Sequence, residues 1–299
     1  MPRVIEFAEP LAPISLAECA DRLAARGFDP ADEDSLLEGS QALKALGSNS
    51  TFLGDLLIEN LKAGYRDEAA NAYGPQVVML ANPGDDCFLR ANIWPSREDA
   101  VLSASGGDAF AFAMPHDHNF SFLTLGYFGP GYWSDYYEFD YEDVAGWTGE
   151  PVDLRFVERA RLSPGKVMLY RAHRDVHVQH PADALSVSIN VMHTAPHQNW
   201  FDQYSFDTAT RTVSGIVTQG ASEVALRLAV ALGIVEGCAV AQDFARSHPS
   251  DRMRLAAWEA LAAGAADHTA RDAVWRQAEV TGNRMIAGEA RRRRALQTA

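Results

Sequence analysis

The segment Pro115-His116-Asp117-His118, followed by Asn119-Phe120-Ser121-Phe122-Leu123-Thr124-Leu125-Gly126-Tyr127, decides the fold that we expect for this 299-residue chain. The pattern is typical of the end of one strand that runs into the next. Successive side chains of an extended strand point to opposite faces, so His116 and His118 project from the same face while Asp117 points away. Two imidazoles on one face of a strand can bind the same metal ion.

His177 offers a third protein ligand for such an ion. It lies in Val176-His177-Val178-Gln179, which follows an apolar segment with a Pro-Gly turn (162–170) and a polar break (173–175). This arrangement predicts a second strand whose face meets the first pair across a small barrel. Three imidazoles suit iron(II), zinc, nickel, copper or manganese, and a substrate or O2 could bind at the open positions. Alternatives to His177 as the third ligand are His173, His180 and the carboxylate of Glu138.

The two segments resemble the two motifs of the cupin family. The first has an H-x-H pair, and the second has a proline-glycine turn, a strand, a tight turn and a single His. Cupins normally carry a Glu four or five positions after the second His of the first motif, where this chain has Phe122 and Leu123. This departure makes the chain most similar to the cysteine dioxygenase branch, the thiol dioxygenases. The resemblance implies an iron ion bound by His116, His118 and His177 without a carboxylate.

Two further segments are similar to that branch. Arg90 lies 26 positions before His116 (116 − 90), close to the place where those enzymes carry the Arg that pairs with the substrate carboxylate. The segment 184–192 resembles their final barrel strand, in which a Ser-x-His-x-Tyr run lies in the active site. The matching residues here are Ser188, Asn190 and Met192, and this exchange argues against cysteine itself as the substrate.

Arg90, Ser188 and Asn190 are therefore the candidate substrate-binding or catalytic residues. An arginine in an otherwise apolar strand needs an anionic partner, either a substrate carboxylate or an internal Asp or Glu. Ser188 and Asn190 would supply hydrogen bonds near the metal. The candidates to line the cavity are the aromatic residues Tyr127, Trp133, Tyr137 and Phe139.

The hydrophobic periodicity of the chain predicts a mainly β fold with helices at both ends, a cupin-type double-stranded β-helix or jelly-roll barrel. Short apolar segments between turn residues predict about eight strands from residue 77 onward, one of them at 109–114. Apolar residues at helical spacing predict helices before and after them. The predicted helices span 12–27, 33–46, 50–63, 221–232, 239–246, 252–263 and 270–294.

We therefore expect three parts: an N-terminal helical layer (1–76), a barrel with the metal site (77–214) and a C-terminal helical region (215–299). The last part lies outside the cupin resemblance. It could be a second small domain, a lid against the barrel mouth, or a dimerisation element that makes the protein a homodimer.

Composition and charge narrow the range of partners. The formal net charge of −14 argues against a nucleic-acid backbone or an anionic membrane surface as a partner. Three widely separated cysteines, Cys19, Cys87 and Cys238, give no disulfide framework. The N-terminal residues lack the apolar run of a signal peptide, and no apolar stretch is long enough for a membrane span. We expect a cytoplasmic protein whose partners are a small molecule and O2.

The function that these observations favour is a mononuclear non-haem iron oxygenase with a three-His site, acting with O2 on a small carboxylate-bearing substrate that is a thiol or amino-acid-like. Two alternatives stay open. A 2-oxoglutarate-dependent hydroxylase usually has two His and one carboxylate, and the first Arg after His177 that could hold the cosubstrate is Arg211. A non-catalytic metal-binding cupin would act as a small-molecule sensor.

Overall fold

The computed structural model describes residues 2–63, 76–218 and 220–298. These residues form two compact units, one within Met1–Phe139 and Arg155–Asn199 (unit 1) and one within Asp140–Leu154 and Trp200–Ala299 (unit 2). The strands of unit 1 are β1 (Arg3–Ile5), β2 (Val77–Ala81), β3 (Cys87–Trp94), β4 (Phe122–Phe128), β5 (Tyr132–Glu138), β6 (Arg155–Leu162), β7 (Val167–Tyr170), β8 (Asp175–Gln179) and β9 (Ser186–His193). Its helices are α1 (Leu16–Arg26), α2 (Glu33–Gly47), α3 (Phe52–Lys62) and α4 (Ala100–Ser105).

Two antiparallel sheets form the centre of unit 1. The larger has the strand order β1-β7-β4-β9-β3-β2, and the smaller has the order β6-β5-β8. The hydrogen-bonded ladders of the described residues do not close these sheets into a continuous barrel. The fold is therefore mixed, with antiparallel sheets and helices, and the jelly-roll closure that the sequence predicts is not detected.

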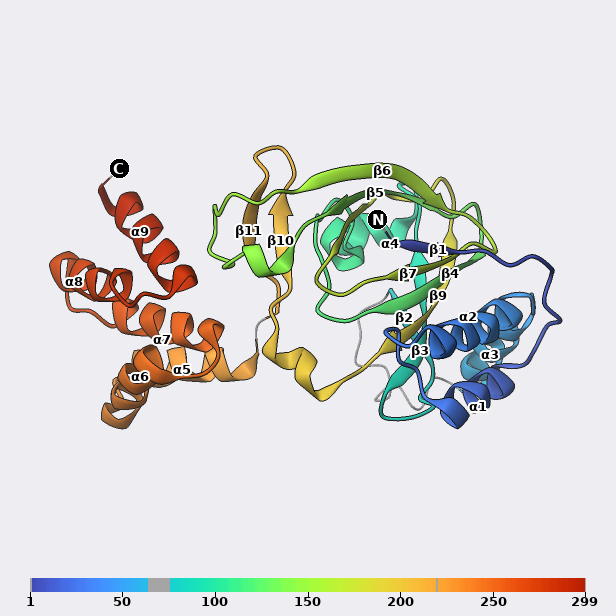
Figure 1. The fold of residues 1–299 in the computed structure, drawn as a ribbon, viewed down its shortest axis with the longest axis horizontal. Coiled ribbons are helices and arrows are strands. Elements are labelled where there is room, and N and C mark those ends of the chain that lie inside the picture. The colour runs from blue at the N-terminus through green and yellow to red at the C-terminus, as the bar shows by residue number, and fades with distance from the viewer. Residues whose placement is uncertain (1, 64–75, 219, 299) are drawn as a thin grey trace. The chain divides into compact units, whose positions relative to one another are not determined.

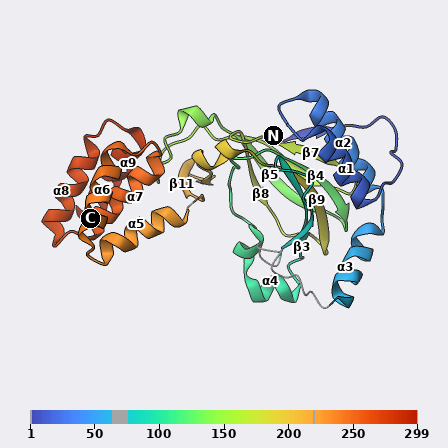
Figure 2. The same ribbon diagram turned by 90° about the horizontal axis from the view of Figure 1, so that it is seen from below.

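The larger sheet separates two hydrophobic cores because its side chains alternate between its faces. Leu89, Leu123 and Val191 pack against the core residues of helices α1 to α3, which cover this face (Figures 1 and 2). Helix α1 starts where it does because Ser15 Oγ accepts a hydrogen bond from the backbone N–H of Glu18 at 3.1 Å. This face therefore fixes the sheet to the N-terminal helices.

The opposite face, which we call the inner face, packs against the smaller sheet. Its row nearest to the histidines pairs Phe88 with Met192, Met192 with Phe122, and Phe122 with Tyr170. These residues share one core with Trp94, Tyr132 and Tyr136. The next row carries Arg90, Asn190 and Thr124, and the row after that carries Asn92 and Ser188. Polar side chains thus line part of this otherwise aromatic interior.

The predicted strand at 109–114 is wrong. A 3₁₀ helix spans Gly107–Phe110, and Ala111 and Ala113 have φ angles of 53° and 58°, in the left-handed region. Phe110 and Phe112 are buried in the core beneath the inner face. Because both are apolar and are separated by one residue, the sequence there alternates as a strand does. Positive φ angles at two nearby residues prevent the extended backbone of a strand.

Unit 2 combines the hairpin of β10 (Tyr204–Asp207) and β11 (Thr212–Ile216), the loop at 140–154 and a bundle of helices (Figure 1). The helices are α5 (Ala221–Ala231), α6 (Val235–Ser247), α7 (Asp251–Ala263), α8 (His268–Glu279) and α9 (Arg284–Thr298). The single helix predicted at 270–294 is interrupted after Glu279, because Gly282 adopts a φ of 76°. None of the helices described here has the length and apolar character needed to cross a membrane.

Candidate metal centre

A short antiparallel bridge sets the first two histidines opposite each other. The backbone N–H of His116 donates to the carbonyl of His177 at 3.2 Å, and the N–H of His177 donates to the carbonyl of His116 at 3.0 Å. Residues paired in this way have their side chains on the same side of the ladder. His118 follows two residues after His116, and its ring joins the other two. The expected strand is thus reduced to a bridge, since β4 begins only at Phe122.

Three ring nitrogens converge at this bridge. Nε2 of His177 lies 3.1 Å from Nε2 of His116 and 3.2 Å from Nε2 of His118. These histidines, which we call the triad, form the cluster of potential metal ligands among the described residues. The separations fit a single ion about 2.1 Å from each nitrogen, with angles between the bonds of about 95 to 100°. The triad is consistent with the metal site that the cupin resemblance implies, and the donor set suits a divalent transition metal ion.

Burial keeps the triad uncharged. It lowers the pKa of His116, and it lowers the pKa values of His118 and His177 well below the ordinary imidazole value of 6.5. The charge of a neighbouring histidine lowers the pKa values of His118 and His177 further. Neutral imidazoles have free lone pairs at neutral pH, and metal binding requires these lone pairs.

The surroundings fix the orientation of the rings. Nδ1 of His116 lies 2.8 Å from the carbonyl oxygen of Met114, and donation by this nitrogen directs the lone pair of Nε2 toward the other histidines. The ring of His118 contacts Phe122, and the ring of His177 contacts Tyr170, with centroid distances of 5.1 and 4.9 Å. An aromatic wall therefore limits the access of water to the triad.

Arg90 lies on the inner face close to the triad. Its positive charge acts on His118 and on Tyr132, although burial is the main cause of the pKa shift of each. In the ladder it pairs with Asn190. The charge of Arg90 therefore acts on one histidine of the triad, and its role toward a substrate stays a prediction.

Ser188 and Asn190 lie on the same face and are hydrogen-bonded to each other. Ser188 Oγ accepts a hydrogen bond from Trp94 Nε1 at 2.9 Å and donates to Asn190 Oδ1 at 3.3 Å. Asn190 Oδ1 also lies 3.5 Å from Thr124 Oγ1. These hydroxyl and carbonyl groups hold the sheet together, and no hydrogen bond between them and the triad is found among the described residues.

The alternative third ligands have other partners. Glu138 accepts hydrogen bonds from Arg171 at 2.8 Å and from Arg174 at 3.2 Å. His180 Nε2 lies 3.0 Å from a carboxylate oxygen of Asp135. His173 does not belong to the cluster of potential ligands, although its backbone N–H donates to the carbonyl of His118 at 2.8 Å.

Four residues of the interior were missed in the sequence. Tyr132 and Tyr136 of β5 are buried in the core beneath the inner face, whereas Trp133 is 40% exposed. The buried polar residues Asn92 and Gln179 also face inward. Alternation along β5 indicates that every second residue is buried. The sequence does not show which alternate set is buried, because aromatic residues occur on both faces of the strand.

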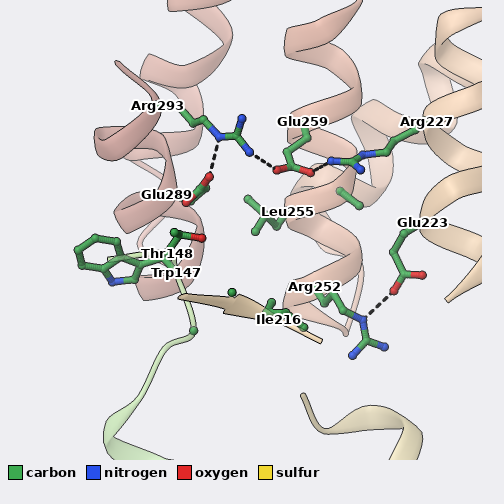
Figure 3. Close-up of a pocket in the computed structure, with 13 residues that line it drawn as sticks. Trp147, Thr148, Ile216, Glu223, Arg227, Arg252, Leu255, Glu259, Glu289 and Arg293 are labelled. Atoms are coloured by element: carbon green, nitrogen blue, oxygen red, sulfur yellow. Dashed lines mark hydrogen bonds and ion pairs between the residues drawn. The ribbon is translucent and has the colours of Figure 1, made fainter. Parts of the chain in front are cut away.

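A pocket of about 260 Å³ lies within unit 2 (Figure 3). Its arginines all pair with carboxylates, and it is smaller than typical ligand sites of about 300 to 1,000 Å³. We therefore interpret it as an ion-pair network that stabilises the helical bundle. The pairs are Arg252 with Glu223, Arg227 with Glu259, and Arg293 with Glu259 and Glu289.

No protein-family model and no curated protein sequence matches this chain. Among solved structures, hydroquinone 1,2-dioxygenase from Sphingomonas sp. TTNP3, with 4-hydroxybenzoate bound, is 11% identical over 42% of this chain and 70% of that chain, with a TM-score of 0.29. The DMSP lyase DddQ from Ruegeria pomeroyi DSS-3 is 11% identical over 64% of this chain and 81% of that chain, with a TM-score of 0.25. These are distant structural similarities to cupin-fold enzymes.

Proposed function

We propose that this protein is a metal-dependent enzyme of the cupin type, a mononuclear non-haem iron(II) oxygenase that acts on a small carboxylate-bearing substrate with O2. The observation that carries the proposal is the convergence of three neutral Nε2 atoms, 3.1 and 3.2 Å apart, in a buried site. Buried imidazoles whose lone pairs face one another need a shared partner. A divalent ion satisfies all three lone pairs at once.

His116, His118 and His177 would hold the ion. An iron(II) ion held there would supply the redox chemistry between the substrate and O2, and three neutral ligands would leave its positive charge undiminished. The carbonyl of Met114 keeps the proton of His116 on Nδ1. The aromatic rings of Phe122 and Tyr170 restrict water around the triad, which favours binding of a substrate over binding of solvent.

Arg90 would bind the carboxylate of the substrate. A guanidinium presents two parallel N–H groups to a carboxylate, and its location near His118 supports a pose in which the rest of the substrate reaches the triad. Substrates of this class are thiol-bearing or amino-acid-like carboxylates.

The test combines metal analysis with O2 consumption. Protein purified from cells grown with iron should contain about one iron per chain, and a panel of thiol and amino-acid-like carboxylates should include at least one that drives O2 uptake. Conversion of 2-oxoglutarate to succinate would instead identify a hydroxylase. Tight binding of a carboxylate without turnover by the iron-loaded protein would indicate a sensor, and the oxygenase proposal would be abandoned.

A further inference from the structure

Two buried amide side chains on the inner face of unit 1 carry oxygen atoms that no described residue satisfies. Gln179 is 5% exposed and Asn92 is 6% exposed. Neither Oε1 of Gln179 nor Oδ1 of Asn92 has a hydrogen-bond partner among the residues that the structure describes. Buried amide oxygens are rarely left so, because they lose their hydrogen bonds to water. A donor from outside the chain would complete both groups.

Gln179 lies against the triad. It follows His177 by two residues on β8, so both side chains share one face of the strand. Nε2 of Gln179 lies 3.3 Å from Nδ1 and 3.2 Å from Nε2 of His177. Such similar distances to two nitrogens on either side of a ring carbon place the amide nitrogen over the face of the ring, where its N–H groups meet the π electrons. The oxygen of Gln179 is therefore free to meet a ligand.

Asn92 lies beyond Arg90 on β3. The two residues are separated by one position, so they share the inner face at a spacing of about 7 Å along the strand. Asn92 pairs with Ser188 in the ladder, whereas Arg90 pairs with Asn190. A cation and an unsatisfied acceptor therefore stand side by side on the sheet, and a second unsatisfied acceptor adjoins the triad.

We infer that the substrate carries hydrogen-bond donors in addition to its carboxylate, as a hydroxy acid or an amino acid does, and that Asn92 and Gln179 bind these donors. The inference rests on the proposed function, because it uses the carboxylate at Arg90 and the metal at the triad. Asn92 accepts from a hydroxyl or ammonium group on the part of the substrate that extends past Arg90. Gln179 accepts from a donor next to the atom that reaches the metal. A plain carboxylic acid leaves both amide oxygens unsatisfied.

Binding of matched ligands to the iron-loaded protein, measured anaerobically by calorimetry, tests this inference. Propanoate is compared with lactate and alanine, and pentanoate with 5-hydroxypentanoate and 5-aminopentanoate, so that each set differs only in the donor. At least one donor-bearing acid should bind about tenfold more tightly than its plain partner, which corresponds to one additional hydrogen bond. Comparison of the hydroxy acid with the amino acid in each set shows whether the donor is a hydroxyl or an ammonium group.

The variants separate the roles of the two amides. In Asn92→Leu, the donor-bearing five-carbon acids should bind no more than about twofold more tightly than pentanoate. In Gln179→Leu, lactate and alanine should likewise bind no more than about twofold more tightly than propanoate. The affinity of the plain acid should stay unchanged in each variant. Asn92→Asp retains an acceptor of the same size and should keep the preference, shifted toward the amino acid. Gln277→Leu, which changes an exposed amide of α8, is the matched control and should bind like the native protein. Metal content and thermal unfolding of each variant confirm that it is folded.

Three results would overturn the inference: equal affinities within every set, a preference that survives in both leucine variants, or no binding of any of these acids to iron-loaded protein. Failure of the proposed function has a different signature. In that case the native protein does not bind iron at the triad, and this is visible in the metal content before any acid is added.

Discussion

The triad of unit 1 and the charged pocket of unit 2 both gather titratable side chains, but they satisfy them in opposite ways. In unit 2, Arg293 donates to Glu289 at 2.6 Å and to Glu259 at 2.8 Å, so that each charge meets an opposite charge of the chain. In unit 1, three uncharged nitrogens face one another, and burial disfavours the protons that could be shared between them.

The difference separates stabilisation from binding. Ion pairs that are complete within the chain contribute to stability and offer little to a ligand. Imidazole groups whose lone pairs converge without a partner lower the stability of the folded chain. A metal ion that binds all of them restores that stability. Changes in unit 2 should therefore alter unfolding without altering metal content, whereas changes in the triad should alter metal content.

The largest expected effect is loss of the metal from His177→Ala. Removing one of three ligands leaves two, and we expect metal affinity to fall by at least about 100-fold, more than the loss of a supporting hydrogen bond causes. Elemental analysis of the purified variant should find less than about a tenth of the native content.

His268→Ala is the matched control, because this histidine is exposed at the start of α8. It should retain the native metal content. Equal metal in His177→Ala and in the native protein would show that the triad is structural and would remove the contrast between the two regions.

The second effect is the destabilisation of unit 2 by Arg252→Met. Arg252 is 16% exposed and pairs with Asp202 and Glu223, whose side chains are 11% and 8% exposed. The substitution leaves two nearly buried carboxylates without their cation, which should lower the free energy of unfolding by about 3 kcal/mol. Denaturant unfolding followed by circular dichroism measures the change, and the metal content should stay native.

Arg276→Met provides the comparison on the surface. Arg276 is 66% exposed and pairs with Asp272 at 2.7 Å. Exposed pairs contribute about 0.5 kcal/mol, so this variant should unfold almost as the native protein does. Equal effects of the two substitutions would contradict the idea that burial gives the pocket its stabilising role.

The sequence predicted the position of the triad because two local patterns indicate it, an H-x-H pair and a lone His between two valines. Turn residues between short apolar segments also predicted strands from residue 77 onward, and β3 (Cys87–Trp94) and β4 (Phe122–Phe128) lie in this part of the chain. Helix α1 was predicted, although its start was placed four residues too early.

The errors have physical causes. Phe110 and Phe112 alternate like strand residues, but they enter the core from a 3₁₀ helix and the turn after it. The aromatic residues of β5 were assigned to the wrong face because Tyr132 and Trp133 both suit a strand. The roles of Asn92 and Gln179 could not be predicted, since an amide reveals its missing partner only when its neighbours are known.

The third effect tests how the loop at 140–154 is held in unit 2. A Cβ atom added at Gly288 of α9 would overlap the indole ring of Trp147. Gly288→Ala should therefore destabilise unit 2 by about 2 kcal/mol through overpacking, even though alanine favours a helix. Thermal unfolding measures the change.

Gly54→Ala is the control, because no residue that the structure describes lies within 4 Å of a Cβ added at this position of α3. Here only helix propensity changes, so the variant should be more stable by about 0.5 to 1 kcal/mol. A stabilising effect of the alanine at both positions would show that Trp147 does not pack on Gly288.

The smallest effect concerns the pH dependence of the metal-free protein. His118 has a folded-state pKa well below the ordinary value of 6.5, chiefly because of burial. Below pH 6.5 the unfolded chain therefore takes up a proton that the folded chain does not, so the stability falls as the pH falls. The slope is about 1.4 kcal/mol per pH unit for each such histidine once the unfolded form is protonated.

His118→Asn removes this linkage while keeping a polar side chain. Unfolding of the two chelator-treated proteins by denaturant between pH 7 and pH 5 should show a shallower loss of stability for the variant, by up to about 1.4 kcal/mol per pH unit. Parallel curves would mean that His118 is protonated as easily in the folded chain as in the unfolded one. That result would contradict the idea that burial lowers the pKa of His118 in the folded chain.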